Sequence, residues 1–347
     1  MSELVKLEND TVSLTVDPFG GAIASLSLNE IDVNPLSFSF SKDQMPANNQ
    51  DGAVYQGHFA CIGRWGTPSI GEIKAGLPHH GEPANIGWTI DEQDTTSLRM
   101  QATATKEGLH VTRKIVLDTY QPVFAVTEEI TNTNVLGRPF NIVQHPTLAA
   151  PFLNADTSID CNAAEGLEQA VYSNVENRNI NWPIVNDMHG QSFDLRKSAV
   201  LHNSVFSFVV KPKDEYGWIT AYSPTHNLLF GYLWKRADYT WIHLWQHFTD
   251  DQITYRGIEF GTAGIHQPFA EFIHSTPTLF GERTYEYLDA GETVTKTYFS
   301  FIHAVEEGFT GVENVFLAND VLYIQARPGG NDININLSKT IANGLQG

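Results

Sequence analysis

Two widely separated residues of this sequence, His145 and Glu259, have the chemistry needed to transfer protons together. His145 lies in NIVQHPTLAAPF, which contains no charged residue, and Glu259 lies in the apolar segment GIEFGT. Burial shifts the pKa of both side chains, so a histidine and a glutamate in such surroundings can be a general acid and a general base near neutral pH. Taken singly, His145 could be a core histidine and Glu259 could pair with Arg256.

Two further segments present polar side chains that could orient a substrate. Arg64 follows a glycine in CIGRWG, where a turn can present a guanidinium that is always charged. His79 and His80 lie in GLPHHGEP, a loop interrupted by proline and glycine. Each also has a simpler interpretation, since Arg64 could stabilise a turn and the two histidines could face solvent.

The segment YTWIHLWQHF alternates as a strand does. Alternation places Trp241, His243, Trp245 and His247 on one face. Two indoles and two imidazoles can stack on the C–H face of a sugar and donate hydrogen bonds to hydroxyls, although an aromatic core face is equally compatible. HLWQH lacks the glutamate of the HExxH motif, and the segment is strand-like, so we do not expect zinc here.

The composition excludes several classes of partner. With 40 acidic and 21 basic residues the net charge is −19, which repels nucleic-acid phosphates and anionic membrane surfaces. The first residues, MSELVKLEND, form no apolar signal segment, and no apolar run reaches the roughly 18 residues of a membrane span, so we expect a cytoplasmic protein. Cys61 and Cys161 are too few for a disulfide framework, and we expect free thiols.

The hydrophobic pattern predicts an all-β fold. Period-2 runs rich in β-branched and aromatic residues predict strands at 12–16, 110–117, 123–131, 205–210, 293–303 and 321–326. Short helical turns are expected only near 161–170 and 269–275. No linker, repeat or charge block divides the chain, so we predict one domain over residues 1–347. We expect a large antiparallel β-sandwich with its core over about residues 10–310 and a frayed tail after Pro328.

In order and approximate spacing, these segments resemble the aldose 1-epimerase family, also called galactose mutarotases. LTVDPFGGAIASL is similar to the opening strands and Gly-Gly turn of that family. IGRWG, HGEPANIGW, QHPTL and GIEFGT are similar to its later motifs and occur in the same order. The resemblance extends over about residues 10–303 and implies the galactose mutarotase-like supersandwich fold.

The resemblance also implies a role for each matched residue. It implies that His145 is the catalytic acid, that Glu259 is the catalytic base, and that Arg64 and His80 bind the substrate. The reaction would interconvert the α and β anomers of a free hexose. A base takes the proton of the C1 hydroxyl while an acid protonates the ring oxygen, and the ring opens. This chemistry requires no metal and no cofactor.

Aromatic platforms for the sugar are a further expectation, and we assign Trp65, Trp241 and Trp245 to them. The sequence departs from the family at two points. Thr147 and Leu148 follow the His-Pro motif, where the family has an aromatic pair. The family aspartate between this motif and the catalytic glutamate has no clear counterpart, and Asp194 and Asp238 both remain candidates. These departures leave the identity of the sugar open.

Three alternatives remain. A hexose-6-phosphate 1-epimerase would need a basic pocket for the phosphate, which the low lysine and arginine content disfavours. A non-catalytic carbohydrate-binding sandwich would keep tryptophan and arginine but would not need the pair of His145 and Glu259. A cupin-like metal site at PHHGE is disfavoured because adjacent histidines on a strand point to opposite faces.

Overall fold

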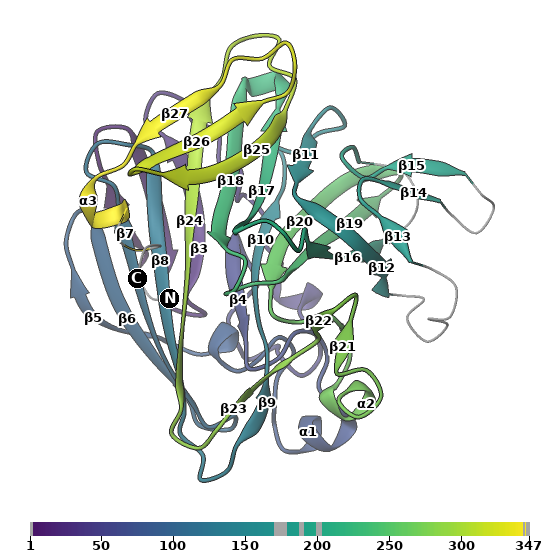
Figure 1. Ribbon diagram of the computed structural model, residues 1–347. Coiled ribbons are helices and arrows are strands. Elements are labelled where there is room, and N and C mark those ends of the chain that lie inside the picture. Colours follow the sequence, from purple (N-terminus) through teal and green to yellow (C-terminus); the bar gives the residue numbers. More distant parts are fainter. Residues whose placement is uncertain (1–2, 170–178, 187–190, 199–202, 343, 345–347) are drawn as a thin grey trace.

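Two large antiparallel sheets form most of the computed structural model, which describes residues 3–169, 179–186, 191–198, 203–342 and 344 (Figure 1). The ten-stranded sheet has the order β1 (Val5–Glu8), β2 (Val12–Asp17), β3 (Ala22–Leu28), β4 (His58–Ile62), β10 (Ile142–Leu148), β20 (Gln252–Gly261), β19 (Trp241–Thr249), β16 (Ser204–Val210), β12 (Ala163–Glu168) and β13 (Ile180–Asn181). The eight-stranded sheet has the order β11 (Ser158–Cys161), β17 (Tyr216–Ser223), β18 (Leu228–Lys235), β24 (Thr293–Ala304), β8 (Val123–Asn132), β7 (Leu109–Leu117), β6 (Ser97–Ala104) and β5 (Thr89–Gln93).

The two sheets pack against each other through one hydrophobic cluster. Alternate residues of most strands enter it, among them Leu14 and Phe260 from the ten-stranded sheet and Val111 and Phe230 from the eight-stranded sheet. Side chains of a strand point to opposite faces in turn, so the other face of the ten-stranded sheet stays available for a second set of residues. The predicted all-β antiparallel sandwich is confirmed.

Shorter strands, helices and 3₁₀ turns lie outside the two large sheets. They are the strand pairs β9 (Arg138–Phe140) with β23 (Glu286–Leu288), β14 (Ile184–Asn186) with β15 (Ser192–Asp194) and β21 (Thr278–Leu279) with β22 (Glu282–Arg283), the helices α1 (Ile70–Lys74), α2 (Phe269–Phe272) and α3 (Lys339–Ala342), and the 3₁₀ turns η1 (Lys42–Gln44), η2 (Pro83–Asn85) and η4 (Pro224–His226). None of the described helices has the length and apolar character to cross a membrane. Cys61 and Cys161 are buried free thiols.

The predicted strands agree with the structure, and the two predicted helical turns have different outcomes. All six predicted segments are strands, and the turn expected near 269–275 is α2. The helical turn expected near 161–170 is wrong for residues 161–168, because β11 ends at Cys161 and β12 covers Ala163–Glu168. Pairing of β11 with β17 and of β12 with β16 overrides a weak local preference, as sheet context commonly does.

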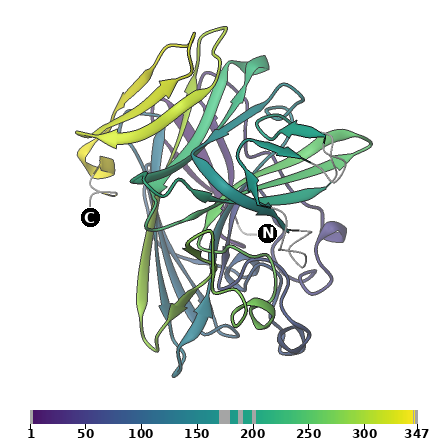
Figure 2. The ribbon, with the colours of Figure 1, turned by 45° about the vertical axis from the view of Figure 1, so that its right-hand side comes forward.

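The prediction of a frayed tail after Pro328 is wrong for residues 333–342. β25 (Val312–Ala318), β26 (Val321–Ala326) and β27 (Ile333–Asn336) form a three-stranded sheet, and α3 follows. Ile335 and Ile341 are buried in a second hydrophobic cluster shared with the eight-stranded sheet, so packed side chains continue past residue 310. This sheet lies at the opposite end of the molecule from α1 and α2, and the turned view keeps the same separation (Figures 1 and 2). The single-domain organisation stays a prediction.

Candidate active site

Neighbouring strands of the ten-stranded sheet bring the candidate catalytic residues together. The antiparallel register of β10 and β20 sets His145 beside Glu259, and β4 adds Phe59 opposite His145. On the next strand, β19 places His243 opposite Glu259. These side chains occupy the face of the sheet turned away from the sandwich core. The predicted alternation of β19 holds, since Ile242 and Leu244 pack in that core.

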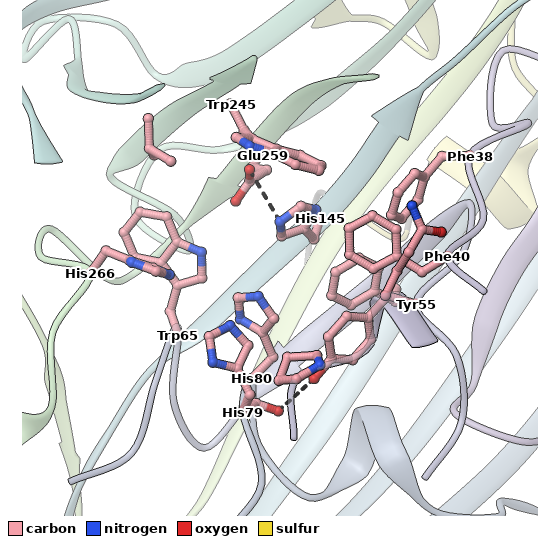
Figure 3. Close-up of a pocket in the computed structure, with 14 residues that line it drawn as sticks. Phe38, Phe40, Tyr55, Trp65, His79, His80, His145, Trp245, Glu259 and His266 are labelled. Carbon is pink, nitrogen blue, oxygen red and sulfur yellow. Dashed lines mark hydrogen bonds and ion pairs between the residues drawn. The ribbon is translucent and has the colours of Figure 1, made fainter. Parts of the chain in front are cut away.

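His145 and Glu259 form a buried pair. His145 Nε2 lies 3.3 Å from Glu259 Oε1, and the two side chains are only 8% and 1% exposed (Figure 3). On the other side of the ring, His145 Nδ1 lies 3.0 Å from the hydroxyl of Thr147, which itself donates to the His145 carbonyl. A hydroxyl has one hydrogen to donate, so it accepts from Nδ1–H. The lone pair of neutral His145 is therefore on Nε2 and faces the glutamate.

Burial favours the uncharged form of both partners. It lowers the pKa of His145 to about 3 and raises the pKa of Glu259 well above its usual range. The pair therefore holds one proton, located between Oε1 and Nε2. Among the described residues, Glu259 Oε2 is buried without a hydrogen-bond partner of good geometry. The nearby side chain of Trp65 opposes part of the rise in the pKa of Glu259 that burial causes. An unpaired buried carboxylate oxygen beside a cavity has capacity for a ligand.

The pair opens into a cavity of about 220 Å³ (Figure 3). Aromatic side chains make up much of its wall: Phe38, Phe40, Tyr55, Phe59, Trp65 and Trp245. Its histidine and acidic side chains are His79, His80, His145, His266 and Glu259. No lysine, arginine or aspartate is among the described residues that line it, so neither Asp194 nor Asp238 takes the place of the family aspartate here.

His79 and His80 both belong to the pocket, which corrects the expectation that adjacent histidines would point to opposite faces. The backbone of His80 is left-handed, with φ of 59°, and this turn brings the two ring centroids within 4.0 Å. Together with His266 they offer three ring nitrogens that lie within 4.8 Å of one another, close enough to raise the question of a metal ion.

The hydrogen bonds of His80 favour a different role for this cluster. His80 Nδ1 accepts from the backbone N–H of Gly66 at 3.1 Å, while the N–H of His80 donates to the Gly66 carbonyl at 3.1 Å. The proton of neutral His80 is therefore on Nε2. A metal-bound histidine normally has the opposite arrangement, because it donates its second ring N–H and binds through the free lone pair. His80 is thus a hydrogen-bond donor, which suits a hydroxyl ligand better than a metal.

Two predicted site residues lie outside the pocket. The terminal nitrogens of Arg64 pair with both oxygens of Glu72 at 2.9 Å, and its Nε lies 3.3 Å from Glu107. Trp241 is fully buried, and its indole N–H donates to the carbonyl of Arg283 at 2.7 Å. These partners occupy the polar groups of both side chains. The substrate-binding roles predicted for Arg64 and Trp241 are therefore not supported by their placement.

The other five predicted residues, His80, His145, Glu259, Trp65 and Trp245, all line the cavity. Their roles stay predictions, but the fold places them around one space.

Sequence reasoning missed part of the wall. His266 lies in GIHQPF, between a glycine and a proline shortly after Glu259, and that setting is similar to the one that marks His145. Phe38 and Phe40 carry no such signal, because SFSF has the alternation of any strand. Only the loop that connects β3 to β4 brings these two rings over the outer face of the sheet.

Comparisons with known proteins show the fold. No protein-family model and no curated protein matches this chain. Among solved structures, a galactose mutarotase-like protein from Clostridium acetobutylicum is 14% identical with a TM-score of 0.60, covering 87% of this chain and 95% of its own. A galactose mutarotase related enzyme from Lactobacillus acidophilus is 11% identical with a TM-score of 0.56, covering 87% and 97%. The chain therefore has the galactose mutarotase-like fold that the sequence resemblance implies.

Proposed function

We propose that this protein is an aldose 1-epimerase, which interconverts the α and β anomers of a free aldose by acid–base ring opening. The observation that carries the proposal is the buried pair of His145 and Glu259, 3.3 Å apart at a cavity, with one carboxylate oxygen unpaired. The reaction involves two oxygens, the C1 hydroxyl and the ring oxygen, and both are bonded to C1. An acid and a base that serve them must therefore lie side by side, as these two groups do.

The proton inventory of the pair suits a reaction without net proton exchange. As the sugar hydroxyl binds at the carboxylate, the shared proton moves from Oε1 of Glu259 to Nε2 of His145. Glu259 then takes the C1 hydroxyl proton while His145 donates to the ring oxygen, and the C1–O5 bond breaks to leave an open aldehyde. Rotation about C1–C2 and reclosure on the other face return both protons. No oxidant or reductant enters this scheme.

The remaining wall supplies orientation. His80 Nε2–H is a donor for a sugar hydroxyl, because Gly66 occupies its other ring nitrogen. Trp65 and Trp245 present indole rings to the cavity, and sugars commonly stack their C–H faces on such rings. Positioning of this kind contributes to rate by holding the reacting atoms in a productive geometry.

The test follows the anomeric equilibration of pure α-anomers by polarimetry, with and without the protein and in the presence of EDTA. The proposal predicts that equilibration is faster with protein, in proportion to its concentration, and that EDTA has no effect. Sugar binding without acceleration would instead favour a non-catalytic carbohydrate-binding sandwich. Loss of acceleration in EDTA would show that the reaction requires a metal ion, which the proposed mechanism does not include.

A further inference from the structure

The cavity has two chemically unlike halves. On one side of the catalytic pair lie His79, His80 and His266, whose ring nitrogens can bond hydroxyls (Figure 3). On the other side lie the rings of Phe38 and Phe40 (Figure 3). A ligand that fills both halves must therefore be polar at one end and apolar at the other.

The aromatic half is held firmly by the backbone. The carbonyl of Phe38 accepts from the N–H of Gly57 at 2.8 Å, and the N–H of Phe40 donates to the carbonyl of Tyr55 at 2.9 Å. The two phenyl rings meet edge to face with centroids 4.9 Å apart, and Phe38 also contacts Trp245 at 6.0 Å. The aromatic half is thus a built wall that does not depend on a bound ligand.

This wall offers little to a hydroxyl group. The hydroxyl of Tyr55 donates to the carbonyl of His79 at 2.7 Å, so its hydrogen is already used (Figure 3). Gln44 is the other polar residue at hand. It is exposed, and its side-chain carbonyl already accepts from the N–H and the hydroxyl of Ser41 at 2.9 Å each, so only its amide N–H groups remain to bond a hydroxyl. A hydroxyl buried here would lose its hydrogen bonds to water and would gain few from the protein.

The catalytic pair fixes which end of a sugar faces the wall. If His145 protonates the ring oxygen, then C5, which is bonded to that oxygen, lies on the His145 side of the substrate. The ring of His145 lies 5.5 Å from the ring of His80 in the polar half. It also stacks on Phe59 with centroids 4.3 Å apart and lies 5.9 Å from the ring of Trp245. Both rings belong to the cluster that contains Phe38 and Phe40. The group attached to C5 therefore points at the aromatic wall.

Building on the proposed function, we propose that the substrate is an aldose with an apolar group on C5, of the 6-deoxyhexose class. Its C1 end and ring hydroxyls meet the carboxylate and the histidines, and its C6 methyl group packs on the phenyl rings. A hexose places a hydroxyl on the same wall and binds less well. A hexose 6-phosphate is excluded, because burying a phosphate requires a cation and the described lining contains no lysine or arginine.

The experiment uses matched sugar pairs that differ only in the C6 hydroxyl: glucose with 6-deoxyglucose and galactose with 6-deoxygalactose, in D and L forms, plus both 6-phosphates. Tryptophan fluorescence reports binding, because Trp65 and Trp245 line the cavity, and polarimetry reports anomerisation. We expect the deoxy member of the best-binding pair to have an affinity and a kcat/KM about ten- to a hundredfold higher, since a misplaced hydroxyl costs that much in an apolar pocket. Neither 6-phosphate should bind.

The two readouts separate this proposal from the proposed function. Tighter binding of the deoxy sugar without anomerisation would keep the ligand class and reject the epimerase. Anomerisation with equal or better use of the parent hexose would keep the epimerase and overturn the ligand class. Failure of every sugar in the panel to bind would overturn both.

A substitution in the wall tests the stated cause. Phe40 is half-buried, and Phe40→Gln gives the wall a group that can bond a hydroxyl, so the deoxy-to-parent ratio should fall about tenfold or more. Phe316→Gln is the control, because Phe316 packs on Tyr323 in the three-stranded sheet and should leave the ratio unchanged. An unchanged ratio in folded Phe40→Gln would contradict the role of the wall. If this variant does not fold, the wild-type ratio still decides the proposal.

Discussion

Two buried carboxylates in this protein, Glu107 and Glu259, have opposite surroundings. Glu107 accepts from Arg64 Nε at 3.3 Å and from the N–H of Glu82 at 2.9 Å, so both of its oxygens are bonded. Glu259 contacts His145 through one oxygen, and its other oxygen is free of well-formed hydrogen bonds beside a cavity. A buried carboxylate with every oxygen bonded stabilises the fold, whereas one with a free oxygen facing a cavity can act on a ligand. The sequence alone does not distinguish the two.

The largest effect that would sharpen this contrast concerns Arg64. Replacing Arg64 with methionine removes the hydrogen bond to buried Glu107 and leaves this carboxylate with Arg138 alone, 4.0 Å away, which should lower the free energy of unfolding by about 3 kcal/mol. Sugar affinity of the folded fraction should not change, because Arg64 lies outside the cavity lining. Urea unfolding and tryptophan fluorescence measure the two quantities. A stable variant with weakened sugar binding would restore the role that the sequence predicted.

Acid should destabilise the protein through the buried histidines of the pocket. Burial lowers the pKa of His79 and His145 to about 3 and of His266 to about 4. In the unfolded chain these histidines take up protons near pH 6.5, whereas in the folded protein they do not until pH 3–4. Their contribution to stability is therefore complete above about pH 6.5 and is lost as the pH falls, by about 1.4 kcal/mol per pH unit for each histidine.

Urea midpoints measured between about pH 7 and pH 5 test this slope. The variant His145→Asn should reduce this slope by the contribution of one proton, about 1.4 kcal/mol per pH unit. His110→Asn, on β7, is a control that lies outside the cavity lining. Burial raises the pKa of Glu259, which gives a slope of opposite sign, so the comparison of the wild type with His145→Asn decides the test. Equal slopes in the two proteins would mean that His145 titrates normally in the folded protein.

A smaller effect concerns the tautomer of His145. Thr147→Val keeps the shape of the side chain but removes the hydroxyl that accepts from Nδ1–H. The rate of anomerisation should fall about tenfold, the equivalent of one hydrogen bond, with sugar affinity unchanged. The pH profile of the rate should shift as well, since the proton on Nδ1 is no longer fixed. A normal rate and profile would show that strand packing alone orients the ring.

The smallest expected effect separates two tryptophans of β19. Trp245→Phe should weaken sugar affinity a few-fold, because Trp245 lines the cavity, whereas Trp241→Phe should leave affinity unchanged. Fluorescence of the remaining tryptophans reports both. Equal losses would mean that the strand as a whole, and not the facing indole, determines binding.

The sequence predicts strands well because alternation is a local property, and the strands that carry His145 and Glu259 bring them together by register alone. Contacts between residues far apart in the sequence cannot be predicted from a local pattern. The pairing of Arg64 with Glu107 spans 43 positions, and no sequence feature near Arg64 predicts it. The left-handed backbone of His80 could not be read from residue types, and it reverses the expectation for the two adjacent histidines.

The most direct test of the central claim is the rate of anomerisation by Glu259→Gln. Glutamine keeps the shape and hydrogen-bonding capacity of the side chain but cannot take the C1 hydroxyl proton. We predict a rate lower by about 10²- to 10⁴-fold, with sugar affinity nearly unchanged, since the lost interaction belongs to the transition state. Glu92→Gln, on the exposed strand β5, should equal the wild type. If Glu259→Gln equilibrates the sugar as fast as the wild type, Glu259 is not the base, and the carbohydrate-binding alternative becomes the better explanation of the pocket.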